Sequence, residues 1–247
     1  MQEILKKCLI SGNQLKLPEG QLDRNTYLAI KKSVTSLGGK WVGGKTQAFV
    51  FDFDPTPLIQ KLTSGNNETA NIKKKLQFFP TPAVVAEDLL SWADISVSDS
   101  VLEPSAGQGA LVTPIVERLP SIVVDVCELE EINRGILLSK LSNNINIVGE
   151  DFLATNFTKE YDWIIANPPF AKNQDIIHIQ HMYSLLKKGG TLLSLSSPSW
   201  QIGSTKKVVA FRKWVEEVGA EVIELNRGCF KESGTNIAPL MLKITKL

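Results

Sequence analysis

The chain has 247 residues, enough for one large α/β domain or for one domain with a small additional module. Hydrophobic residues make up 43% and charged residues 21%, an ordinary balance for a globular protein. The net charge of +1 excludes a chain that is basic throughout, so contacts with nucleic acid would have to come from local patches. No apolar run approaches the roughly 18 residues of a membrane span, and the start, MQEILKKCLI, shows no signal-peptide pattern.

The cysteines and histidines give no pattern of a disulfide framework or a metal site. Cys8, Cys127 and Cys229 lie far apart, with no C-x-x-C pair among them. His178 and His181 share a face of a predicted helix, but no cysteine and only one acid lie near them, so we expect no bound metal. Reduced thiols and the missing targeting pattern predict a cytoplasmic protein without membrane contact.

Residues 1–62 are predicted to form a small α+β module whose role the sequence does not indicate. Asp23 is placed to cap a helix over Arg24–Leu37, which a pair of glycines would end. Lys40–Val42 and Gln47–Phe51 flank a glycine-containing turn, a pattern typical of a β-hairpin.

Residues 63–77 are polar and without periodicity, so they are interpreted as a linker. From residue 78 to residue 247, short apolar strands alternate with amphipathic helices, which is typical of a parallel sheet with helices on both faces. The last two strands have no helix between them and are expected to pair antiparallel. We therefore predict a doubly wound, mostly parallel α/β domain. Its predicted strands are Ser100–Glu103, Ile122–Glu128, Ile145–Val148, Tyr161–Ala166, Thr191–Ser196, Glu221–Leu225 and Ala238–Thr245. Its predicted helices are Pro82–Ala93, Gly109–Arg118, Glu131–Leu141, Gln174–Leu186 and Lys206–Val218.

The turn after the first of these strands is a candidate ligand site. Its sequence, VLEPSAGQG, ends with Gly107 and Gly109, and glycines at a strand-to-helix turn let a ligand lie against the backbone. The motif is G-x-G rather than the longer G-x-G-x-x-G, so the turn alone also fits a tight bend without a ligand.

Acids at the ends of the next two strands extend this candidate site. Glu128 follows the glycine turn by about 20 residues, the spacing at which an acid accepts hydrogen bonds from ribose hydroxyls. Asp151 follows the third strand and is expected to accept from an adenine amino group, while Phe152 packs on the ring. Together the residues predict a nucleoside-binding edge of the sheet.

The fourth strand runs into Asn167, Pro168, Pro169 and Phe170, the candidate catalytic loop. Two successive prolines have a fixed φ and no N–H, so the loop is stiff and presents acceptors. The carbonyl oxygens of the Asn167 side chain and the Pro168 backbone could each hold one hydrogen of an aromatic amine. The lone pair of the amine nitrogen would then point at a methyl donor. Such a loop would catalyse transfer by positioning the amine and by electrostatic stabilisation. Phe170 offers a face for a flipped-out base.

These segments resemble the class I S-adenosylmethionine-dependent methyltransferases, and in particular the DNA adenine-N6 methyltransferases with an NPPF motif. The resemblance covers residues 78–247 and is carried by Phe79-Pro80-Thr81-Pro82, Glu103 to Gly109, Glu128, Asp151-Phe152 and Asn167 to Phe170. It implies a seven-stranded Rossmann-like sheet and S-adenosylmethionine as the cofactor. It further implies that Thr81 contacts the methionine end of the cofactor, and that Glu103, Ala106 and Gly107 line the same pocket.

The resemblance leaves the acceptor open. Many DNA-modifying members carry a large target-recognition domain after the catalytic one, whereas 77 residues follow Phe170 here. Recognition of a base sequence is therefore expected from residues 1–62 or from a specificity subunit. Adenine N6 in DNA is the leading acceptor. The alternatives are adenine N6 or guanine N2 in RNA, a protein glutamine amide, or a modification subunit that is inactive without its partner.

Overall fold

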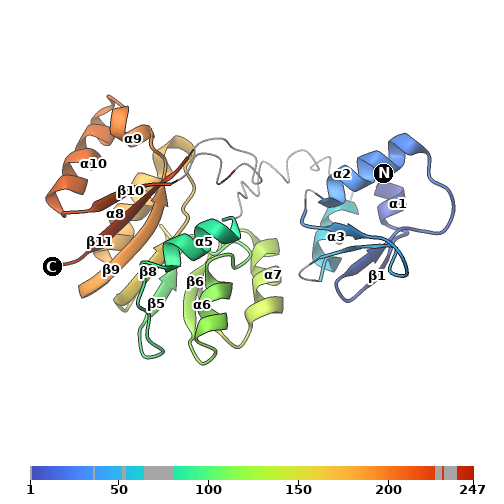
Figure 1. Cartoon of the computed structure of the whole chain (residues 1–247), viewed down its shortest axis with the longest axis horizontal. Helices are drawn as coiled ribbons and strands as arrows, with labels where there is room; N and C mark the ends of the chain where they lie inside the picture. The colour runs from blue at the N-terminus through green and yellow to red at the C-terminus, as the bar shows by residue number, and fades with distance from the viewer. Residues whose placement is uncertain (1, 36, 52–53, 64–80, 226–229, 231–237) are drawn as a thin grey trace. The chain divides into compact units, whose positions relative to one another are not determined.

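The computed structural model describes residues 2–35, 37–51, 54–63, 81–225, 230 and 238–247. The chain divides into two compact units, Met1–Leu76 and Gln77–Leu247 (Figure 1). Most of the predicted linker, residues 63–77, lies outside the described residues. No helix in the described ranges is long and apolar enough to cross a bilayer.

The smaller unit is built around a four-stranded antiparallel sheet with the order β1-β2-β4-β3. The predicted helix is confirmed, and Asp23 Oδ1 accepts a hydrogen bond from Thr26 N at 2.9 Å, as expected for a cap. The predicted hairpin is confirmed as well. The unit contains α1 (Gln2–Leu5), β1 (Leu9–Ser11), β2 (Gln14–Lys16), α2 (Arg24–Thr35), β3 (Lys40–Val42), β4 (Ala48–Val50) and α3 (Thr56–Thr63).

The larger unit contains the predicted seven-stranded sheet, with the order β10-β11-β9-β8-β5-β6-β7. Neighbouring strands from β9 to β7 are parallel, and β11 is antiparallel to both β9 and β10, as expected. Its strands are β5 (Val101–Glu103), β6 (Val124–Cys127), β7 (Ile145–Gly149), β8 (Tyr161–Ala166), β9 (Leu186–Ser196), β10 (Glu221–Glu224) and β11 (Leu240–Thr245). Its helices are α5 (Ala83–Leu90), α6 (Val112–Arg118), α7 (Glu131–Leu141), η1 (Ala171–Asn173), α8 (Gln174–Ser184), α9 (Ser199–Ile202) and α10 (Lys206–Glu217).

Helices cover both faces of this sheet, so the prediction of a doubly wound fold is confirmed (Figure 1). On one face, Val85 of α5, Ile115 of α6 and Leu137 of α7 pack in a single apolar cluster with the strands. On the other face, Ile179 of α8 and Phe211 of α10 belong to a second cluster. The sheet is therefore buried on both sides, and its strand ends are the places where polar groups can meet a ligand.

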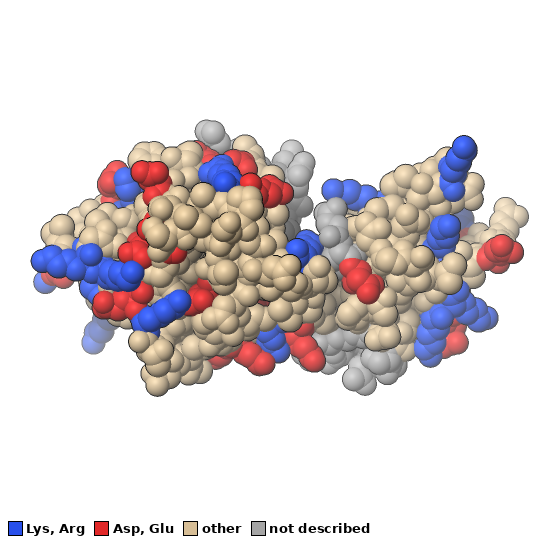
Figure 2. Space-filling view, turned by 90° about the horizontal axis from the view of Figure 1, so that it is seen from below, with Lys and Arg blue, Asp and Glu red and all other residues tan. Residues whose placement is uncertain are grey.

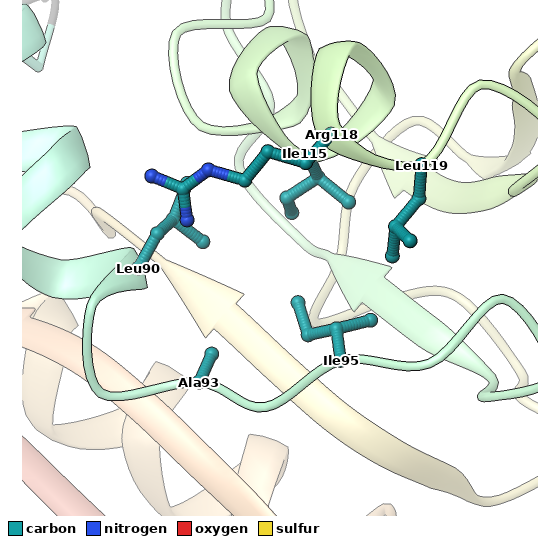
Figure 3. Close-up of a pocket in the computed structure, with 6 residues that line it drawn as sticks. All are labelled: Leu90, Ala93, Ile95, Ile115, Arg118 and Leu119. Carbon is teal, nitrogen blue, oxygen red and sulfur yellow. The ribbon is translucent and has the colours of Figure 1, made fainter.

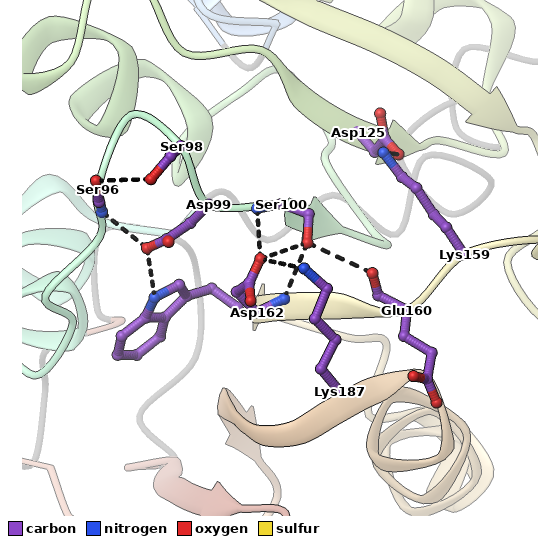
Figure 4. Close-up of polar contacts among 10 residues, drawn as sticks. Ser96, Ser98, Asp99, Ser100, Asp125, Lys159, Glu160, Asp162 and Lys187 are labelled. Carbon is purple, nitrogen blue, oxygen red and sulfur yellow. Dashed lines mark hydrogen bonds and ion pairs between the residues drawn. The ribbon is translucent and has the colours of Figure 1, made fainter.

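The amino ends of three strands are joined by one carboxylate (Figure 4). Asp162 Oδ2 accepts hydrogen bonds from Ser100 N at 2.8 Å, Ser100 Oγ at 2.7 Å and Lys187 Nζ at 2.7 Å. Ser100 precedes β5, Asp162 belongs to β8 and Lys187 to β9. Partial burial alone would raise the pKa of Asp162, but these hydrogen bonds lower it to about 2. The carboxylate is thus charged at neutral pH and fixes this edge of the sheet.

A small cavity of about 110 Å³ lies between the ends of α5 and α6 (Figure 3). The Arg118 side chain at its rim forms an ion pair with Glu87. Because α6 runs back from the carboxyl edge of the sheet, its last turn lies toward the opposite edge, away from the strand ends considered below. The cavity is lined by Leu90, Ala93, Ile95, Ile115, Arg118 and Leu119.

Charged side chains of both signs are interspersed over the surface drawn in Figure 2, in keeping with a net charge of +1. The chain as a whole therefore has no dominant electrostatic potential of one sign.

Candidate active site at the carboxyl edge of the sheet

The predicted site residues follow the carboxyl ends of four adjacent strands. Asn167 follows β8, Glu103 ends β5, Glu128 follows β6 and Asp151 lies just beyond β7. The strand order β8-β5-β6-β7 with parallel pairing brings these four ends to one edge of the sheet. This is the edge at which open α/β sheets bind ligands.

The glycine turn is held against the end of β6. Ala106 N donates to the Cys127 carbonyl at 3.0 Å, and Gly107 N donates to Glu128 Oε2 at 2.7 Å. Gly107 has φ +55°, a conformation that favours glycine. The two predicted parts of the nucleoside site, the turn and Glu128, are therefore in direct contact.

Gly109 has a packing reason to be glycine. Its φ is +88°, and an added Cβ would lie 2.9 Å from Leu137 Cδ1. A side chain at this position would thus push against α7. Its predicted contact with a cofactor stays a prediction.

Glu128 is fixed by a set of donors that the sequence did not identify. Its Oε1 accepts from Glu130 N at 2.9 Å and from Asn133 Nδ2 at 3.2 Å. Asn133 Oδ1 in turn accepts from Gln108 Nε2 at 3.3 Å, which returns to the glycine turn. An asparagine in the first turn of the helix that follows an acidic strand end is the sequence signal for this support.

Glu103 is a buried acid at the end of β5. Its side chain is 2% exposed, and Oε1 accepts a hydrogen bond from Ser105 N at 3.1 Å. Burial raises the pKa of this carboxyl to about 8, with a smaller contribution from the charge of Glu128. At neutral pH the group is therefore mostly protonated until a cation comes close to it.

Asp151 and Phe152 lie in different surroundings. Asp151 is exposed, and its Oδ1 accepts from Leu153 N at 3.0 Å. Phe152 is 2% exposed, with ring centroids 4.7 Å from His181 and 5.3 Å from His178. Its contact with an adenine ring stays a prediction.

The two histidines of α8 belong to this aromatic cluster. Burial lowers the pKa of His178 to about 4 and lowers that of His181 as well. Both rings are thus neutral packing partners at pH 7. The part of the chain that the structure describes contains no group of His, Cys, Asp and Glu side chains suited to hold a metal ion.

The catalytic-loop candidate begins with a side-chain contact to a distant residue. Asn167 Nδ2 donates to Thr81 Oγ1 at 3.0 Å, across 86 residues of sequence. Thr81 is 8% exposed, so the hydrogen bond is shielded from water. It uses the amide nitrogen of Asn167 and therefore turns that end of the side-chain amide toward Thr81.

The rest of the loop is packed against the domain. Pro168 is buried, and Pro169 is partly buried. Phe170 is partly buried and packs against the apolar cluster that includes Val85 and Leu195. The loop is therefore stiff through both its prolines and its packing.

The loop ends in two left-handed residues that the sequence did not predict. Lys172 and Asn173 both have φ +56°, which is uncommon for residues other than glycine. Two side chains from after β9 hold Asn173: Lys207 Nζ donates to its carbonyl at 2.8 Å, and Ser199 Oγ reaches its Oδ1 at 3.5 Å. Such strained backbone persists only where surrounding contacts determine it, and it is common at functional sites.

Asp175 ties α8 to the segment after β9. Its side chain is 1% exposed, and Oδ2 accepts from Ser197 N at 2.8 Å. Burial raises the pKa of this carboxyl above its usual range. Phe79 and Pro80, which also carried the family resemblance, lie outside the described residues.

Comparison with known proteins gives one family. The model of the methyltransferase small domain family, MTS, matches residues 86–212, just over half of the chain. The modification methylase CviBIII of Paramecium bursaria Chlorella virus NC1A is 28% identical over 197 residues, 71% of this chain and 52% of the viral protein. The ribosomal RNA small subunit methyltransferase C of Proteus mirabilis is 28% identical over 117 residues, 42% of this chain and 33% of that enzyme. The chain thus spans about half or less of the length of these relatives.

The matches among solved structures include a protein that aligns with nearly all of the chain. A modification subunit assigned to a type I restriction enzyme of Vibrio vulnificus YJ016 aligns with a TM-score of 0.56 and 14% identity, over 94% of this chain and 59% of that subunit. At this identity the likeness concerns the fold.

Proposed function

The chain belongs to the methyltransferase small domain family, and from that premise we propose that it transfers a methyl group from S-adenosylmethionine to the N6 amino group of adenine in DNA. The enzyme class and the cofactor follow from the family. The acceptor is the proposed part. It draws support from the relatives, among them the modification methylase CviBIII and the type II methyltransferase M.AccI of Acinetobacter calcoaceticus.

The residues at the carboxyl edge fit this cofactor. The buried Glu103 carboxyl, whose pKa burial raises to about 8, has the chemistry to receive the cofactor's ammonium group. Glu128 would accept from the ribose hydroxyls and Asp151 from the adenine amino group. Ala106, Gly107 and Gly109 would let the ligand lie against the turn, with Thr81 near the methionine end and Phe152 near the adenine. When bound, the cofactor supplies an electrophilic methyl group.

The proposed catalytic residues act by orienting the acceptor amine. An exocyclic amine is a weak nucleophile because its lone pair is delocalised into the ring. Asn167 Oδ1 and the Pro168 carbonyl would accept its two hydrogens and favour a tetrahedral nitrogen with the lone pair free to react. Pro169 keeps the loop rigid, and Phe170 would stack on the base, a contact worth about 1–3 kcal/mol in other systems.

One observation carries the proposal: Asn167 is oriented by its 3.0 Å hydrogen bond to Thr81, at the same sheet edge as the two buried acids. A loop that merely ended a strand would not need its asparagine amide oriented by a buried partner.

The test uses labelled cofactor and purified protein with separate pools of DNA, RNA and protein. We expect label in the DNA pool, at N6 of adenine. Asn167→Ala should abolish transfer and leave cofactor affinity within about two-fold, since its role is to orient the amine. Asn156→Ala, an exposed asparagine after β7, is the matched control and should behave as wild type. Full activity of the Asn167→Ala protein would refute the mechanism.

Two alternatives keep the site and change the acceptor or the assembly. The Proteus ribosomal RNA methyltransferase among the relatives favours RNA as the second candidate, and label confined to the RNA pool would select it. Label confined to the protein pool would select a glutamine amide. The Vibrio modification subunit favours a specificity partner, and label in no pool together with normal cofactor binding would select that reading.

A further inference from the structure

The two units of the chain carry opposite net charge. Residues 1–76 contain twelve Lys and Arg against six Asp and Glu, a net charge of +6. Residues 77–247 contain fifteen against twenty, a net charge of −5. A polyanion thus meets net repulsion from the catalytic unit and net attraction from the smaller unit.

The four-stranded sheet of the smaller unit has one covered face. Leu15 and Phe49 are directly opposite each other on β2 and β4, and both are 0% exposed. Phe51 points to the same side as Phe49. Val34 of α2 lies close to Phe51 on that side, since a Cβ added to Gly39 would approach both Val34 Cγ1 and Phe51 Cζ. Trp41 lies in the same row at the sheet edge, in an edge-to-face contact with Phe49 at 5.0 Å.

The neighbouring rows point to the other face, since side chains alternate along a strand. They include Lys16 of β2 and Lys40 of β3, both exposed. They also include Leu9 at 65% and Val42 at 41% exposed, whereas Ala48, in the same row, is buried. Lys45, in the turn between β3 and β4, is exposed too.

This open face, defined by Leu9, Lys16, Lys40, Val42 and Lys45, is cationic and unpaired. The four strands and the two hairpin turns contain no acid. Within the described ranges, none of the three lysines forms an ion pair. Lysine stems and apolar side chains around free ammonium groups suit the phosphates and sugars of a nucleic-acid backbone.

We infer that the open face of the four-stranded sheet binds the phosphate backbone of duplex DNA and supplies the substrate affinity that the acidic catalytic unit lacks. The inference rests on the proposed function for the choice of DNA. Because the smaller unit would contact the phosphates of the DNA, the binding is strongly salt-dependent and has little dependence on base sequence.

The experiment measures binding of the full chain to a fluorescent DNA duplex over a series of salt concentrations. The variant Lys16→Gln/Lys40→Gln removes two cations of the open face. We expect binding about ten-fold weaker or more at 0.1 M salt, and a slope of log affinity against log salt that is smaller by about 2. In methyl transfer, KM for DNA should rise about ten-fold while kcat stays the same.

The matched control is Lys31→Gln/Lys32→Gln, which removes the same charge from α2, on the covered side of the unit. This control should bind within about two-fold of wild type. Equal weakening by both pairs would overturn the inference, because only net charge would then matter. Unchanged binding of the open-face pair, or tighter binding of an RNA duplex than of DNA, would overturn it as well.

The proposed function fails or succeeds separately, in the transfer assay of the wild-type chain. If wild type binds DNA through Lys16 and Lys40 but labels no DNA, the docking surface stands and the acceptor assignment falls. If wild type labels DNA and the open-face pair behaves as wild type, the acceptor stands and the docking surface falls.

Discussion

The hydrogen bond between Asn167 and Thr81 joins two segments that lie 86 residues apart. Its donor belongs to the proposed catalytic loop, and its acceptor is the hydroxyl of a nearly buried threonine. Replacing that hydroxyl with a methyl group keeps the shape and removes this hydrogen bond, a loss of about 0.5–1.5 kcal/mol. The contact that orients the Asn167 amide against residue 81 would then be lost.

We therefore expect Thr81→Val to lower kcat about ten-fold, which corresponds to about 1.4 kcal/mol, with KM for DNA unchanged. Thr81→Ser retains the hydroxyl and should restore most of the rate. The measurement is steady-state transfer of labelled methyl groups. A valine variant with wild-type kcat would show that the hydrogen bond does not position the loop.

Single residues differ in how far the sequence predicts their surroundings. Asn167 and Glu128 could be placed at strand ends because the strand pattern sets which residue comes last. The contact of Asn167 with Thr81, and the support of Glu128 by Asn133, depend on how distant segments pack. Periodicity carries no information about such pairs.

Helices and strands were predicted well where their apolar pattern is long. The strand Tyr161–Ala166 and the helix Glu131–Leu141 have the predicted bounds. The start of β9 was placed too late, at Thr191 rather than Leu186, because two lysines and two glycines interrupt its pattern. The β1–β2 hairpin, α1, α3 and α9 were missed, since strands of three residues and helices of one or two turns leave little periodicity.

A buried network connects three strands in the larger unit. Asp125 of β6 is 3% exposed and accepts hydrogen bonds from Tyr161 Oη at 2.8 Å and Asn146 Nδ2 at 3.1 Å. Lys159 Nζ, from a half-exposed side chain, completes it at 2.7 Å. A buried carboxylate depends on each of these donors.

Removing one donor should therefore destabilise the fold. We expect Tyr161→Phe to lower the free energy of unfolding by about 1–3 kcal/mol, as measured by urea denaturation. Tyr183→Phe is the matched control, because in the described part of the chain the Tyr183 hydroxyl has no hydrogen bond, and its change should stay within about 0.5 kcal/mol. Equal losses in the two variants would show that the hydrogen bond from the Tyr161 hydroxyl to Asp125 does not stabilise the fold.

Two buried groups give the folded chain an unusual dependence on pH. Burial raises the pKa of Glu103 from 4.5 to about 8, so between these values the folded state binds a proton that the unfolded state has released. Stability then falls as pH rises. Burial lowers the pKa of His178 from 6.5 to about 4, so its effect is a loss of stability as pH falls below 6.5. Between pH 6.5 and 8 only the Glu103 effect of these two operates.

In the absence of cofactor, we expect stability to decrease from pH 6.5 to 8, by no more than about 1.4 kcal/mol per pH unit for this one proton. Glu103→Gln cannot ionise and should remove most of that slope. Glu117→Gln, at an exposed position on α6, should keep it. Urea denaturation at pH 6.5, 7.2 and 8.0 compares the three proteins. A slope that persists in Glu103→Gln would assign the proton to another group.

The carboxylate of Asp162 has a consequence for how the larger unit opens. It fastens the amino ends of β5, β8 and β9 together, and the amides of Asp162 and Trp163 both donate to the Ser100 carbonyl. Local fluctuations should therefore begin at the opposite edge, where the proposed site lies. Amide hydrogens of residues 161–163 should exchange with deuterium far more slowly than those of residues 170–173. We therefore expect the proposed site to open for a substrate while the amino ends of the strands stay joined, so that entry and release need no separation of the sheet.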